Sequence, residues 1–223
     1  MKSKIIARRP YDPKTIIIVD DGRLPKELLD MHKQRIDAIF ANQSEEYRNE
    51  QLNKVIMHDI LFSKAMDFLF RQYEFSIDQD DVNEYQKLLL GNNPMPTEQS
   101  AIDGLKISAT QQIVKDLIFN DIRERNNIIV TDEELEKVLL SYYQQTNQSI
   151  RNFKNDKESY ENARMSILNE KIANHILSSF EFDLDKFNKQ VEEMMKQLEN
   201  AKKENVQFLF QNNIIKILGK EHV

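Results

Sequence analysis

The scarcity of turn-forming residues is the strongest constraint on the fold of this chain. Only 4 glycines and 5 prolines occur among its 223 residues. A β-sandwich or β-barrel reverses direction roughly every ten residues and needs such residues at many of its turns. Apolar residues make up 40% and charged residues 30%, a balance typical of a folded, well-solvated protein. The sequence therefore predicts an all-helical fold with long helices and few loops.

Charge and cysteine content exclude several classes of function. The formal net charge is −6, whereas a nucleic-acid-binding protein needs a basic face that replaces condensed counterions. The one marked basic cluster, Lys2, Lys4, Arg8 and Arg9, is short, so a solvated tail is favoured over a nucleic-acid contact. The absence of cysteine rules out disulfides, thiolate nucleophiles and cysteine-type zinc sites.

The chain shows no signal for a membrane. No apolar run approaches the ~20 residues that a membrane-spanning helix needs. Residues 16–19 are too few for the core of a signal peptide. We therefore expect a cytoplasmic protein with no membrane partner, and the Lys-, Asn- and Ile-rich composition would suit a bacterium with an AT-rich genome.

Apolar periodicity predicts most of the chain to be helical. Residues 1–23 are expected to form an extended arm, in which residues 15–19 are either a short strand or an apolar plug. The clearest loop runs from Gly91 to Pro96. The predicted helices cover residues 25–40, 44–73, 80–90, 97–125, 132–143, 157–180 and the chain from about 183.

One junction pattern recurs at three helix starts. An apolar residue precedes a capping residue at Ile77-Asp78, Val130-Thr131 and Phe182-Asp183. Thr131 and Glu134 have the spacing of a capping box. Either a true internal repeat or ordinary helix–turn–helix junctions would produce this pattern.

The C-terminal helix carries an apolar seam at alternating steps of three and four residues, from Leu184 to Ala201. That spacing suits a coiled coil, but it lasts for under three heptads. A helix that packs on its own core shows the same spacing. Packing within the chain and a partner helix, possible in a homo-oligomer, both stay open.

No constellation of catalytic residues is visible. The four histidines include no two within one helical turn, and no glycine-rich phosphate loop is present. Acidic pairs are abundant, as in any charge-rich helical protein. We therefore predict no enzyme, no metal and no cofactor. A carboxylate–metal enzyme, the minor alternative, would carry bound metal when purified.

Two stretches resemble the C-terminal domain of the chaperone trigger factor. Residues 113–118 lead into the junction 129–135, and residues 163–172 look like the closing helix of that domain. Upstream, Phe75 to Asp78 resembles a family junction, with Asp78 in the place of a proline. No Gly-Phe-Arg ribosome-docking loop occurs, and there is no room for a prolyl-isomerase domain. The chain thus resembles a stand-alone client-holding module, similar also to SurA-type chaperones.

The resemblance implies the domain organisation and the function. It implies long helical arms around a concave cradle in residues 45–182, preceded by an arm and first helix (1–44) and followed by an amphipathic helix and tail (183–223). It implies ATP-independent binding of unfolded or nascent polypeptides. The alternative is a helical scaffold or adaptor that binds one specific partner through its C-terminal helix.

Apolar side chains that helical packing does not obviously use are the predicted contacts with a client polypeptide. These side chains are Met95, Phe119, Tyr143, Phe153 and Met195.

Overall fold

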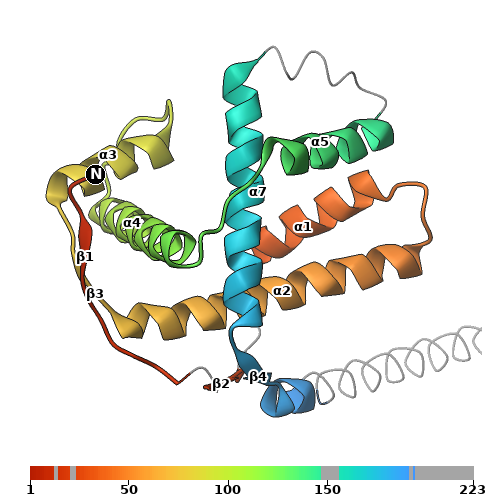
Figure 1. Cartoon of the computed structure of the whole chain (residues 1–223), viewed down its shortest axis with the longest axis horizontal. Helices are drawn as coiled ribbons and strands as arrows, with labels where there is room; N and C mark the ends of the chain where they lie inside the picture. Colours follow the sequence, from red (N-terminus) through yellow and green to blue (C-terminus); the bar gives the residue numbers. More distant parts are fainter. Residues whose placement is uncertain (13–14, 21–23, 147–155, 191–192, 194–223) are drawn as a thin grey trace, which may run out of the picture. The chain divides into compact units, whose positions relative to one another are not determined.

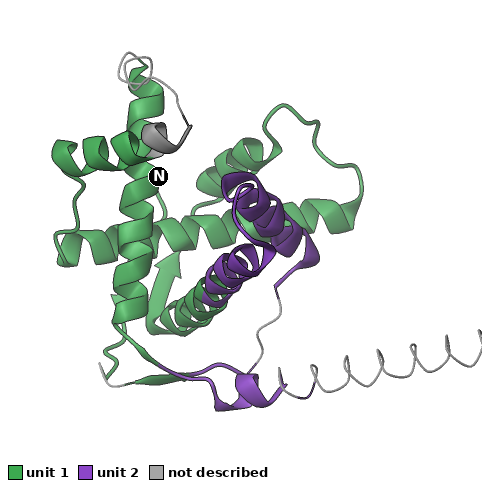
Figure 2. Ribbon diagram, turned by 90° about the vertical axis from the view of Figure 1, so that its right-hand side faces the viewer, with its two compact units in different colours: residues 1–17, 58–181 green, residues 18–57, 182–223 purple. Residues whose placement is uncertain are grey.

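The computed structural model divides into two compact units, which Figure 2 colours separately. Unit 1 contains residues 1–17 and 58–181, and unit 2 contains residues 18–57 and 182–223. The structure describes residues 1–12, 15–20, 24–146, 156–190 and 193. For residues 142–146 it describes the backbone and not the side chains.

The described residues of unit 1 form helices and an antiparallel pair of strands. Strand β1 (Lys4–Arg8) pairs with strand β3 (Tyr73–Ser76), and the register shifts between Ile5 and Ala7. The helices are the second part of α2 (Glu45–Gln72), α3 (Gln79–Leu90), α4 (Gln99–Arg125), α5 (Asp132–Thr146) and α7 (Lys157–Ser178), all labelled in Figure 1.

The N-terminal segment is extended, as predicted, but it is not a free arm. Asp81 is buried and accepts hydrogen bonds from the backbone N–H groups of Lys2 (2.7 Å) and Ser3 (2.5 Å). The Lys2 ammonium also pairs with Asp80 at 2.6 Å. This docking could not be predicted from local patterns, because the partners are nearly eighty residues apart in the chain.

Helices α3 and α4 form a hairpin around one core cluster of unit 1. Gly91 ends α3 with a positive φ of 55°, and its N–H bonds to carbonyls of the last turn. A positive φ is strained for residues with a Cβ, which explains the glycine here. The buried residues of the core are Val82, Ala109, Ile113 and Leu117, with Ile5, Phe75, Ile77 and Tyr85 packed against them.

The predicted capping box opens α5. The Thr131 hydroxyl accepts a hydrogen bond from the N–H of Glu134 (3.2 Å), and the Glu134 carboxylate accepts one from the N–H of Thr131 (3.1 Å). Lys171 of α7 donates to the same carboxylate at 2.9 Å. Behind this turn, Leu135 and Leu139 form a second small core against α7. Local capping and tertiary packing therefore support the same junction.

The described part of unit 2 consists mainly of α1 (Lys26–Ile39) and the first part of α2. Phe40 and Tyr47 pack edge to face with ring centroids 5.4 Å apart, and Arg48 pairs with Asp37 at 3.2 Å. Strand β2 (Ile16–Ile18) pairs with β4 (Glu181–Asp183), and each of these two strands contains residues of both units. Val19, which follows β2, is fully buried. The strand alternative for residues 15–19 is therefore the one observed.

The all-helical class is confirmed, since helices dominate the described part of the chain and its strands are few and short. All three predicted capping residues cap as expected, with Asp78 accepting from the N–H of Asp80 and Asp183 from that of Asp185. The concave cradle and the domain boundaries at 44 and 182 stay predictions; the compact units follow a different division. The heptad seam lies outside the described residues beyond 190.

Candidate functional site

An apolar pocket opens on unit 1 between the second part of α2 and α4, with a volume of about 710 Å³. Its residues recur every three or four positions on both helices, so each helix contributes one continuous face. Leu89, at the end of α3, completes the lining. The apolar residues of this pocket are Phe62, Met66, Phe70 and Leu89. The polar and charged ones are Ser63, Asp67, Arg71, Ser108, Gln111, Gln112 and Lys115.

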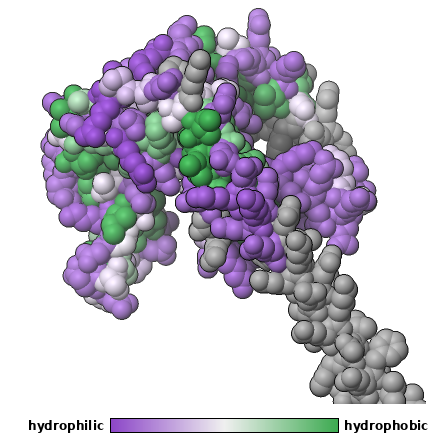
Figure 3. Space-filling model, turned by 90° about the horizontal axis from the view of Figure 1, so that it is seen from below, coloured by the Kyte–Doolittle hydropathy of each residue, from purple (hydrophilic) through white to green (hydrophobic). Residues whose placement is uncertain are grey.

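Large apolar side chains stay exposed on the α3–α4 hairpin that borders this pocket. Leu88 is 69% exposed and Leu89 49%, while Met95 in the connecting loop is 50% and Ile107 of α4 59% exposed. Figure 3 shows hydrophobic side chains gathered in patches between hydrophilic ones on one face. Single exposed apolar residues are ordinary, but several on one hairpin beside an apolar pocket are typical of a binding surface.

Phe119 lies under this pocket instead of on its surface. It is only 6% exposed and packs edge to face on Phe62, with ring centroids 6.0 Å apart. The Lys115 ammonium lies 5.3 Å from the Phe119 ring centroid and 5.8 Å from that of Phe62. The prediction that helical packing leaves Phe119 unused is therefore wrong. The cause is its place on α4, where the packed helices cover most of the circumference.

The other predicted contacts have different outcomes. Met95 is half exposed, as its loop position suggested, and its contact with clients stays a prediction. The side chain of Tyr143 and all of Phe153 and Met195 lie outside the described residues. Sequence reasoning missed Leu88 and Leu89. A signal was available, because three consecutive leucines at 88–90 cannot all face the core from one helix.

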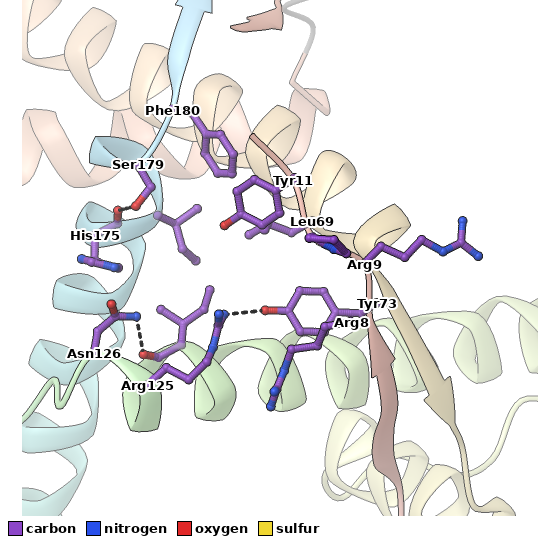
Figure 4. Close-up of a pocket in the computed structure, with 13 residues that line it drawn as sticks. Arg8, Arg9, Tyr11, Leu69, Tyr73, Arg125, Asn126, His175, Ser179 and Phe180 are labelled. Carbon is purple, nitrogen blue, oxygen red and sulfur yellow. Dashed lines mark hydrogen bonds between the residues drawn. The ribbon is translucent and has the colours of Figure 1, made fainter. Parts of the chain in front are cut away.

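A second pocket of about 490 Å³, here called the arginine pocket, lies between the end of β1, α2, α4 and α7 of unit 1 (Figure 4). Its apolar floor contains Leu69, Ile122, Ile176 and Phe180, all at most 8% exposed. The Tyr11 ring stacks on Phe180 with a centroid distance of 5.6 Å. The basic residues in the lining are Arg8, Arg9, Arg125 and His175.

A buried carboxylate fixes two of these arginines. Asp121 is 6% exposed and pairs with Arg8 of β1 and with Nε of Arg125 at 2.9 Å. The Tyr73 hydroxyl donates to Asp121 (2.9 Å) and accepts from Arg125 (2.9 Å). Burial, and next the hydrogen bond to Asp121, raise the pKa of Tyr73 above its usual range. The phenol therefore stays neutral and holds both its partners.

Two further observations concern the described part of the chain. None of its helices is long and apolar enough to cross a bilayer. No group of three or more side chains suited to a metal ion lies together in it.

The fold places this protein among all-helical proteins with an exposed apolar hairpin. A comparison with family models then identifies its family. The family model for the C-terminus of the bacterial trigger factor protein matches residues 30–178. The chain belongs to this family, which confirms the resemblance found in the sequence.

Relatives of similar length exist in mycoplasmas. The uncharacterized protein MG377 of Mycoplasma genitalium is 26% identical, and its homologue in Mycoplasma pneumoniae is 28% identical. Each alignment covers 82% of this chain and 93% of the relative. The crystal structure of the hypothetical Mycoplasma protein MPN555 is similar, with a TM-score of 0.70 and 27% identity over 82% of this chain and 91% of that one.

Proposed function

We propose that this protein binds unfolded or nascent polypeptides without ATP and holds their apolar segments on the α3–α4 hairpin and in the apolar pocket. The observation that carries the proposal is the exposure of Leu88, Leu89, Met95 and Ile107 on the hairpin that borders a pocket lined by phenylalanines. Membership of a chaperone-type family supports it.

Apolar burial suits such a function, because it does not depend on the direction or sequence of the bound chain. At ~25 cal/mol per Å², burial of about 300 Å² of apolar client surface gives about 7.5 kcal/mol before the ordering of the client is subtracted. Micromolar affinity corresponds to about 8 kcal/mol after that subtraction, so a client must bury more than this area to bind in the micromolar range, and shorter apolar segments should bind more weakly and reversibly. Lys115 and Arg71 at the pocket add positive charge, but Asp67 offsets part of it.

The double substitution Leu88→Ser/Leu89→Ser tests the proposal. Both side chains are exposed, so the variant should fold and melt like the parent protein. We expect it to bind a fluorescently labelled, permanently unfolded client at least severalfold more weakly, and to suppress aggregation of a denatured model protein less well.

A matched control is Ile129→Ser, which removes an equally exposed apolar side chain (57%) from outside both pockets. The control should leave client affinity unchanged. Unchanged affinity in the double variant, with an intact melt, would reject the hairpin as the binding surface. Recovery of one stoichiometric partner from cells in place of many unrelated proteins would favour an adaptor.

A further inference from the structure

We propose that the arginine pocket binds a carboxylate carried next to a large apolar group. In an unfolded client polypeptide, this carboxylate belongs to an acidic residue or to the C-terminus of the client, beside an aromatic or aliphatic side chain. This inference rests on the proposed function, because it gives the binding of polypeptides a preference in sequence. It concerns a site separate from the apolar pocket, since the two pockets share no lining residue.

The charge of the arginine pocket is the first argument. Its lining contains arginines and a histidine but no carboxylate. Beneath it, Asp121 is shared by Arg8 and Arg125, so one negative charge faces two positive ones. A net positive charge therefore remains at this point of a chain whose overall charge is −6. An anionic group is the complementary ligand.

The hydrogen-bonding capacity of the two arginines is the second argument. Asp121 and Tyr73 engage Nε and one terminal nitrogen of Arg125, and Asp121 engages one terminal nitrogen of Arg8. A guanidinium carries five N–H donors, so donors are left over on both residues. Their side chains are 50% and 46% exposed, whereas that of Asp121 is 4% exposed. The buried carboxylate thus fixes the guanidinium groups and leaves them open to a second carboxylate.

The floor of the pocket is the third argument. In Figure 4 the rings of Tyr11 and Phe180 lie on one side, and Arg125 points toward the Tyr73 hydroxyl on the other. A ligand that places its carboxylate at the arginines would therefore set a neighbouring apolar group against aromatic rings and the buried Ile176. A volume of about 490 Å³ lies within the range of small-ligand pockets and admits one or two side chains.

A polypeptide explains these features better than a nucleic acid does. Of the N-terminal basic cluster, Lys2 pairs with Asp80 and Arg9 pairs with Glu74, so acidic neighbours compensate both of these charges. The guanidinium of Arg9 also points away from the pocket in Figure 4. The cluster therefore forms no continuous track for a phosphate backbone, whereas a single carboxylate needs only the two arginines above Asp121.

Fluorescence anisotropy with short labelled peptides tests the inference on the full-length protein. One amidated peptide carries Glu next to Phe, a second carries Gln in place of that Glu, and a third lacks Glu but ends on Phe with a free carboxylate. We expect at least one carboxylate-bearing peptide to bind about tenfold more tightly than the Gln peptide. Binding of the first or the third peptide identifies the side chain or the chain terminus as the source of the carboxylate.

Two variants locate the site, and a third serves as control. Arg125→Gln and Arg8→Gln each leave Asp121 one arginine partner, so the buried carboxylate stays compensated and the protein should fold. Each should reduce the preference for the carboxylate to less than threefold. Arg123→Gln removes an equal charge from the same helix outside the pocket and should retain the preference.

Equal binding of the carboxylate and Gln peptides by the parent protein would overturn the inference. An equal loss in Arg123→Gln would also overturn it, because it would show a general effect of charge. Displacement of the peptide by a short RNA would assign the pocket to nucleic acid instead. Aggregation of a denatured client is measured in parallel: suppression without carboxylate preference rejects only this inference, whereas preference without suppression rejects only the proposed function.

Discussion

Replacement of Phe119 by alanine distinguishes two roles for this residue, namely packing in the core and direct contact with a client polypeptide. The Phe119 side chain is 6% exposed and contacts the Phe62 ring edge to face. Phe62 lines the apolar pocket, so the substitution removes support from under the candidate site without touching its exposed residues. A structural role and a direct role in client binding therefore predict different results.

The magnitude follows from the burial of the ring. A phenylalanine buries roughly 200 Å² on folding, which corresponds to about 5 kcal/mol as an upper bound at ~25 cal/mol per Å². Measured losses for Phe→Ala in cores are about 3–5 kcal/mol. That is a large part of the ~5–15 kcal/mol by which domains are stable. For a protein of this length the melting temperature should fall by about 6–20 °C.

The assay is a thermal melt followed by circular dichroism, with client affinity measured well below the melting temperature. Phe119→Ala should melt far below the parent protein and keep most of its affinity. The matched control is Met95→Ala, because Met95 is half exposed and should change stability by less than about 0.5 kcal/mol. A melting temperature of Phe119→Ala within about 2 °C of the parent would refute the burial of this ring.

Three further outcomes follow from the structure. Thr131→Ala removes one half of the capping box and should lower the unfolding free energy by about 1 kcal/mol, which urea denaturation measures. Hydrogen bonds from Ser3 lower the pKa of Asp81, and one from Lys171 lowers that of Glu134; such carboxylates stabilise the fold above their unfolded pKa values of 3.8 and 4.5. Stability should therefore fall as the pH drops below about 4.5, and Asp81→Asn should flatten that decline in melts between pH 7 and pH 3. Deletion of residues 183–223 should leave unit 1 folded, with its helical signal and cooperative melt; complete unfolding would contradict the predicted boundary.

The helices and their junctions could be predicted from the sequence, because the interactions that form them are local. A helix is encoded by apolar residues three and four positions apart, and a cap by a polar residue at its start. The prediction of a helix over 44–73 matches α2 (Glu45–Gln72) closely, and the capping box at Thr131 forms as its spacing requires. The low content of glycine and proline likewise predicted the all-helical fold class.

The candidate sites depended on contacts between residues far apart in the chain. Arg8 and Asp121 are 113 residues apart and lie on a strand and a helix that no periodicity brings together. Periodicity also could not show that Phe119 is covered, because burial depends on which neighbours pack around a helix and not on the helix itself. Exposure of Leu88 and Leu89 is the reverse case: apolar residues are more numerous at the end of α3 than its packed face can bury. Local patterns along the chain were therefore enough to predict the helices, the caps at their starts and the family. Which apolar and charged side chains remain available to a ligand depends on long-range packing, which no local pattern encodes.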